Sequence, residues 1–180
     1  MRRFSFFILL FFYFTSFSLT TLEAQSADLL QQINFFSTFE ANQNLENIRL
    51  NTYKPQKRTD FVLALSTNVD NLRDKCVVGY VTSNRLLNKL NYYKKNNYAK
   101  TVLEVKALFK KLEYNLAVIH YYTKLLSKNP NKNVKKYITI MKKKMAQCRL
   151  IQKQLQQKSG MLAEIGEWEK KYGTLTGEFR

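Results

Sequence analysis

Hydrophobic residues recur at intervals of three and four positions through most of the chain after residue 27. This spacing places them on one face of an α-helix. Four segments follow the pattern, which predicts helices over residues 28–48, 60–95, 98–128 and 134–172. The third segment keeps the spacing most regularly, and its predicted core positions are Val102, Val105, Phe109, Leu112, Leu116, Ile119, Thr123 and Leu126.

Short connections with their own signals separate these segments. Pro55 lies in a connection over residues 51–59 that also carries a cluster of Lys and Arg, and Asn129, Pro130 and Asn131 predict a tight turn. Proline ends helices because it lacks an N–H and clashes with the preceding turn. The first segment is the weakest, since it turns polar after Phe39. We expect an all-α fold, an elongated antiparallel bundle of three long helices plus a shorter N-terminal helix, about 45–60 Å long.

The chain begins with the features of a secretory signal peptide. An arginine pair precedes an apolar run over residues 4–19, which is shorter than the roughly 20 residues that a membrane-spanning helix needs. Small residues follow this run, so we expect residues 1–24 to be removed, with cleavage after Ser26 as a second site. Residues 25–180 are then expected to form a single helical domain, periplasmic or extracellular, with no transmembrane segment. An uncleaved signal anchor is the alternative.

The two cysteines, Cys76 and Cys148, both fall on predicted apolar seams. If the second and fourth helices flank the third, they run parallel and carry the two cysteines at roughly similar heights. Export exposes the chain to an oxidising compartment, and a bridge across about 70 residues contributes roughly 4 kcal/mol in the chain-entropy model. We therefore predict a Cys76–Cys148 disulfide, with two buried free thiols as the alternative. This wide spacing gives no metal-site signature.

The chain is strongly basic, with 30 Lys and Arg against 13 Asp and Glu. Lysine greatly outnumbers arginine, which is typical of a general field for polyanions rather than of base-specific recognition. An up-and-down bundle places the lysines near the helix ends in two groups at opposite ends of the rod. The smaller group is Lys94, Lys95 and Lys100. The larger group, with its tyrosines, is a candidate face for an anionic partner: Lys124, Lys128, Lys132, Lys135, Lys136, Tyr121, Tyr122 and Tyr137. A solvated lysine-rich surface is the alternative.

The sequence contains no recognisable set of catalytic residues. His120 is the only histidine, and it lies beside the predicted seam of the third helix, where a structural role is usual. Glu164, Glu167 and Glu169 form an acidic cluster that is typical of a solvated helix end. The chain has no nucleophile elbow and no glycine-rich phosphate loop, and we can assemble no Ser-His-Asp set from it. We expect no enzyme activity, no cofactor and no metal.

A signal peptide followed by a long helical hairpin bundle is similar in kind to periplasmic minor-pilus subunits of type IV secretion and conjugation systems. This likeness concerns architecture over most of the mature chain and implies no site residues. Sixteen asparagines without one glycosylation sequon favour a bacterial envelope protein. We therefore expect an exported, non-enzymatic interaction protein in a multi-protein envelope assembly. The alternatives are a binder of lipopolysaccharide, anionic lipid or nucleic acid, with nucleic acid disfavoured by export, and a eukaryotic secreted helical effector.

Overall fold

The computed structural model describes residues 21–172, and this part of the chain is 89% helical without a strand. The all-α prediction is confirmed. Among the described residues, none of the helices is long and apolar enough to span a membrane. The helices are α2 (Leu22–Phe35), α3 (Phe39–Leu50), α4 (Pro55–Tyr92), α5 (Asn96–Lys128), α6 (Val134–Gln157) and α7 (Ser159–Tyr172).

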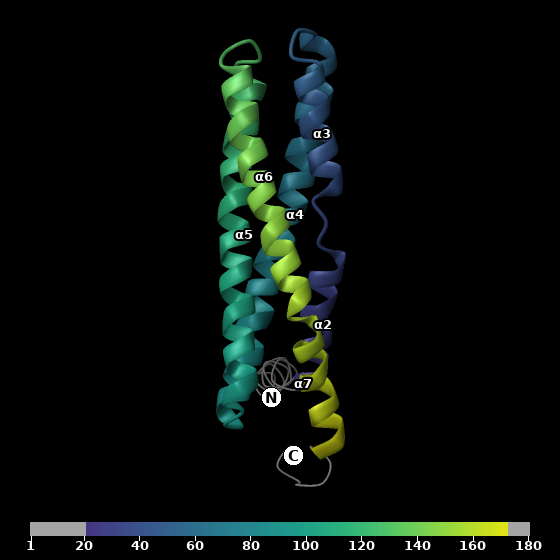
Figure 1. Cartoon of the computed structure of the whole chain (residues 1–180), viewed down its shortest axis with the longest axis vertical. Coiled ribbons are helices and arrows are strands. Elements are labelled where there is room, and N and C mark those ends of the chain that lie inside the picture. The colour runs from purple at the N-terminus through teal and green to yellow at the C-terminus, as the bar shows by residue number, and fades with distance from the viewer. Residues whose placement is uncertain (1–20, 173–180) are drawn as a thin grey trace, which may run out of the picture.

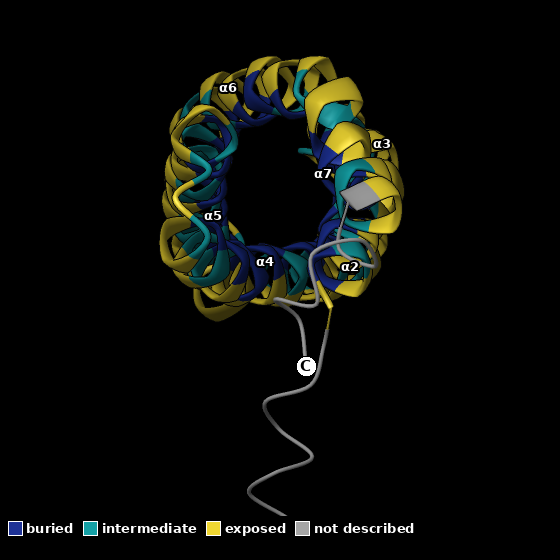
Figure 2. Cartoon of the chain, turned by 90° about the horizontal axis from the view of Figure 1, so that it is seen from below, coloured by how far each residue is buried: buried dark blue, intermediate teal, exposed yellow. Residues whose placement is uncertain are grey.

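The helices form four antiparallel columns in one elongated bundle (Figure 1). The helices α2 and α3 follow each other along one column, α4 and α5 form a column each, and α6 and α7 share the fourth. Buried residues face the centre of this ring of columns (Figure 2). Neighbouring columns pack directly, whereas every Cα of α4 lies more than 8 Å from every Cα of α6. The helices α4 and α6 therefore lie on a diagonal of the bundle.

The regular spacing in the third predicted helix correctly identified the core. All eight predicted positions on α5 are buried, and Phe109 is fully inaccessible. Gly79 of α4 faces the Phe109 ring so closely that an added Cβ would lie 2.5 Å from its Cζ. The missing side chain at Gly79 thus provides the space that this aromatic ring fills between α4 and α5.

The first predicted helix, over residues 28–48, is two helices in the structure. They are separated at residues 36–38, and together they run along the whole bundle as a complete fourth column. Side chains of other columns satisfy carbonyl groups at the break: Lys75 Nζ donates to the carbonyl of Phe35 at 2.8 Å, and Gln152 Nε2 donates to that of Phe36 at 3.0 Å. These long-range bonds stabilise a break that no local signal predicts.

The other boundaries differ from the prediction for local reasons. Pro55 is the first residue of α4, a position that proline tolerates, so the connection before α4 is shorter than predicted. The fourth predicted helix is interrupted at Lys158, which separates α6 from α7. The turn around Pro130 is present as predicted. Gly173, expected to end the last helix, and the predicted signal peptide up to residue 20 lie outside the described residues.

Candidate functional site

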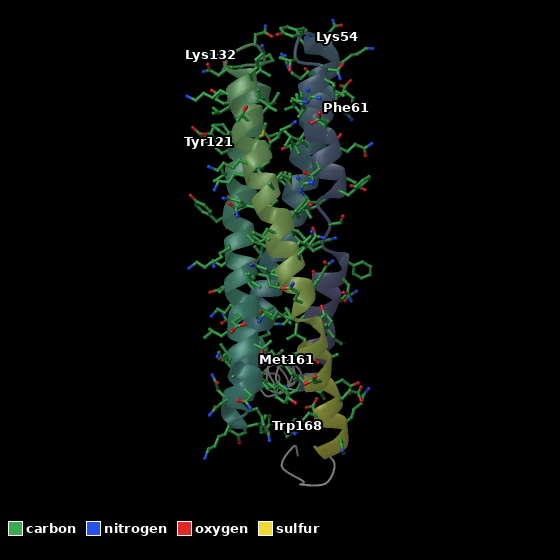
Figure 3. The ribbon with its side chains drawn as sticks, in the orientation of Figure 1. Lys54, Phe61, Tyr121, Lys132, Met161 and Trp168 are labelled. Atoms are coloured by element: carbon green, nitrogen blue, oxygen red, sulfur yellow. The ribbon has the colours of Figure 1, made fainter. Side chains whose placement is uncertain are left out.

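One end of the rod carries most of the excess positive charge. The turn between α3 and α4 meets the turn between α5 and α6 there, and Lys54 and Lys132 lie at this end in Figure 3. We define the basic end as residues 46–60 and 121–142, which hold ten lysines and arginines but only two carboxylates. The fold therefore gathers two basic stretches that are about 70 residues apart in sequence.

One of the two carboxylates of the basic end is already engaged. Glu46 forms ion pairs with Arg49 and, at 2.7 Å, with Lys142 of α6. The hydrogen bond from Arg49, followed by that from Lys142, lowers the pKa of Glu46 to about 2. Glu46 thus stays ionised at neutral pH and links α3 to α6. The other lysines of the basic end are exposed.

The predicted anionic-partner residues all lie at the basic end, with different exposures. Their lysines are exposed: Lys124, Lys128, Lys132, Lys135 and Lys136. Among the tyrosines, Tyr121 is exposed, whereas Tyr122 is half-buried and packs against Tyr137, with ring centroids 5.2 Å apart. The structure thus brings the predicted lysines to one end, but it uses two of the three tyrosines in packing between α5 and α6.

Sequence reasoning missed Arg58, which is 2% exposed. Its guanidinium donates to the carbonyl of Thr52 through Nη1 and to Oδ1 of Asn131 through Nη2, the latter at 3.0 Å. Arg58 therefore links the α3–α4 turn to the α5–α6 turn. The Lys/Arg cluster around Pro55 was visible in the sequence, but only the complete fourth column places it beside the second turn.

The lysines of the smaller group lie at the opposite end, where carboxylates are more frequent. Lys95 Nζ lies 4.1 Å from the centroid of the Trp168 ring, and Trp168 marks this end in Figure 3. Glu169, expected at a solvated helix end, instead accepts hydrogen bonds from the backbone N–H groups of Leu22 at 3.0 Å and Glu23 at 2.5 Å. It thereby caps α2 from α7.

His120 contacts a carboxylate within the bundle. His120 Nδ1 lies 2.9 Å from Asp70 Oδ1, between α5 and α4. Partial burial lowers the pKa of His120, and the charge of Asp70 opposes this shift. A single imidazole held against one carboxylate between two helices fits a structural contact.

Cys76 and Cys148 are buried free thiols in this structure. Burial raises the pKa of both, that of Cys148 to about 12. Their helices lie on the bundle diagonal with all Cα separations above 8 Å, whereas a disulfide spans about 4.4–6.8 Å between Cα atoms. The helices α4 and α6 do not pack directly against each other, because they lie on the diagonal of the ring of columns. The predicted bridge therefore requires the backbones of α4 and α6 to move closer.

The bridge stays a prediction with a direct test. Titration of the unfolded, unreduced exported protein should detect no free thiol if the bridge forms after export. Detection of two thiols would instead agree with the separation of α4 and α6 in this structure. Reduction should lower the free energy of unfolding only in the bridged case, and a variant with both cysteines replaced by alanine is the control that should not respond to reduction.

An aromatic pair marks the break between α2 and α3. Phe35 is 62% exposed and Phe39 is 71% exposed, although the spacing of apolar residues in the first predicted helix places Phe39 on its apolar face. Two open depressions adjoin Phe39, one toward α4 and one toward α6. Exposed aromatic side chains beside hollows are a second surface on which a protein partner could pack.

Comparison with known proteins identifies no relative: no protein-family model, curated protein or solved structure matches this chain. Function is therefore inferred from the geometry and charge of the rod itself. Those features show an all-α bundle with a strongly basic end.

Proposed function

We propose that this chain is an exported, non-enzymatic interaction protein of the bacterial cell envelope. It serves in a multi-protein assembly such as a secretion or conjugation apparatus, and its basic end contacts an anionic surface of a protein partner. The single observation that supports this proposal is the concentration of ten cations and only two carboxylates at one end of the rod.

The position of the charge suits docking through the tip of the rod. A cluster of like charges raises the local potential and speeds the encounter with an opposite surface. Each exposed lysine contributes little alone, because salt screens it within about 8–10 Å. Docking by the basic end leaves the length of the bundle, with Phe35 and Phe39, free for a further contact in an assembly.

The same lysines support a second candidate function, binding of lipopolysaccharide, anionic lipid or nucleic acid. A stacking platform for bases is less favoured, because Tyr122 and Tyr137 pack against each other. Binding to heparin with a steep dependence on salt concentration would favour this second candidate.

Charge reversal at the basic end tests the proposed function. We expect the triple variant Lys132→Glu, Lys135→Glu and Lys136→Glu to fold normally, because all three side chains are exposed. Capture of the partner by crosslinking in the native organism should fall at least about tenfold, since the variant replaces attraction by repulsion. Circular dichroism and identification of the captured proteins provide the measurements.

A matched triple reversal at Lys94, Lys110 and Lys111 is the control, because these exposed lysines lie outside the basic end. This control should capture the partner as the unmodified protein does. Unchanged capture by the basic-end variant would contradict the proposal. The contact would then be sought at Phe35 and Phe39.

A further inference from the structure

Arg58 carries a buried charge without a carboxylate partner. An arginine guanidinium stays protonated in proteins, and buried charges are normally paired. The two acceptors of Arg58, a backbone carbonyl and an amide oxygen, are both neutral. None of the ion pairs in the described part of the chain includes this residue. The basic end therefore contains a fixed positive charge that no internal anion balances.

A depression of about 610 Å³ lies over this charge and opens to the solvent. Arg58 belongs to its lining, and the exposed Lys135 and Lys136 stand at the same hollow. The pKa of Lys135 is raised by its hydrogen bond to Tyr53, so that lysine remains charged. The complete lining is Thr52, Tyr53, Pro55, Arg58, Asn131, Asn133, Val134, Lys135 and Lys136.

Two helices also begin at this depression. The helix α4 starts at Pro55 and α6 starts at Val134, and both residues belong to the lining. Neither helix has a hydrogen bond from its N-cap side chain, and neither has an acidic residue in its first turn. The positive ends of two helix dipoles and free backbone N–H groups therefore meet at a hollow that already holds a buried guanidinium.

We propose that this depression binds an oxyanion of the phosphate or sulfate class. Lys135 and the first backbone N–H groups of α6 contact the anion directly, while Arg58 beneath it supplies a charge that water screens weakly. Asn131 contributes by holding the guanidinium in place. This inference extends the proposed function by naming the chemical group that the basic end recognises. Its biological role rests on the proposed function, whereas binding of the oxyanion does not.

The test uses the exported protein in isolation and inorganic phosphate or sulfate as the probe. At constant ionic strength, we expect the melting temperature to rise with the logarithm of the phosphate concentration above the dissociation constant, as binding to one site in the folded state requires. Isothermal calorimetry should give a saturable response with a stoichiometry of one. Chloride at the same ionic strength should not reproduce the effect.

The variant Arg58→Met should lose the saturable response. Methionine is an unbranched side chain that adapts to irregular spaces, and circular dichroism checks that this variant folds. The double variant Lys135→Gln and Lys136→Gln tests the rim without changing the buried charge, and should weaken phosphate binding at least about tenfold. Lys110→Gln with Lys111→Gln is the matched control and should bind phosphate normally.

A saturable response that persists in Arg58→Met would overturn the proposal. If that variant does not fold, undiminished binding by the rim double variant would overturn it equally. A rise in melting temperature that is equal in all variants, without a saturable heat of binding, identifies general salting-out, which also overturns it. These measurements use the isolated protein without a partner. A negative result therefore does not bear on the crosslinking test of the proposed function.

Two further binding experiments distinguish a lipid headgroup from a soluble phosphate ester as the source of the anionic group. Sedimentation with vesicles of phosphatidylglycerol, compared with phosphatidylcholine, tests a lipid headgroup, and titration with glucose 6-phosphate tests a soluble phosphate ester. Arg58-dependent binding in either arm supports the proposal and assigns the source. Absence of Arg58-dependent binding to both, together with absence of phosphate binding, overturns it.

Discussion

Replacing Phe109 by alanine should lower the free energy of unfolding by about 3–5 kcal/mol, the range found for buried aromatic side chains. Phe109 is fully buried between α5 and α4, which form the most extensive helix pair of the bundle. Its removal leaves a cavity against Gly79, where no side chain exists to fill the space. Urea unfolding followed by circular dichroism measures the loss.

The effect of Gly79→Ala on the free energy of unfolding should differ in the Phe109→Ala background. In the unmodified protein, Gly79→Ala places a Cβ 2.5 Å from the Phe109 ring, so overpacking of about 1–3 kcal/mol outweighs or cancels the gain of about 1 kcal/mol in helix propensity. Without the ring, the clash is absent and the same substitution should stabilise by about 1 kcal/mol. The double-mutant cycle should therefore show a coupling energy above about 1 kcal/mol.

Gly160→Ala is the control, because an added Cβ there meets nothing within 4 Å. Its effect should be the same with and without Phe109. If Gly79→Ala also has equal effects in both backgrounds, the close approach of Gly79 to the ring does not exist in solution.

The sequence predicts those parts of the fold that depend on local periodicity. The core face of α5 follows from the spacing of apolar residues alone, because a long amphipathic helix places such residues on one side whatever its neighbours are. The turn at Pro130 is equally local. The up-and-down order of the predicted helices is enough to divide the lysines near the helix ends into a smaller and a larger group at opposite ends of the rod.

The sequence does not predict features that depend on contacts between distant segments. The break at Phe36 is held by Gln152, which lies 116 positions away, and no local pattern signals that bond. The separation of α4 from α6, which carry Cys76 and Cys148, likewise depends on how distant segments are arranged around the core. Arg58 entered the candidate site only because the fourth column carries the α3–α4 turn to the end of the rod.

The residue at which the chain begins after cleavage should also have a large effect on the free energy of unfolding. The helix α2 begins at Leu22, which precedes both predicted cleavage sites. Leu22 is completely buried, and the side chain of Thr21 accepts a hydrogen bond from the N–H of Ala24 at 3.0 Å. A chain that begins at Ala27 lacks this buried leucine, the cap from Thr21 and the backbone N–H groups that Glu169 binds.

We expect a chain beginning at Ala27 to be about 3 kcal/mol or more less stable than one beginning at Thr21. Loss of a buried leucine costs about 2–5 kcal/mol, and loss of an N-cap about 1 kcal/mol. A chain beginning at Gln25 should lose most of this stability as well. Urea unfolding of the three chains, with N-terminal sequencing of the protein purified from its native source, gives the comparison.

Leu22→Ala in the chain that begins at Thr21 is the control, and it should reproduce most of the loss through the apolar contact alone. Equal stability of all three chains would contradict a structural role for the first turn of α2. The expected difference has a consequence for the exposure of α7. Gly166 of α7 lies within reach of Ser26 and Glu23, so we expect a chain that begins at Ala27 to uncover this part of α7. We expect a chain that begins at Thr21 to keep that surface covered, so the position of the N-terminus should change the exposure of α7 around Gly166.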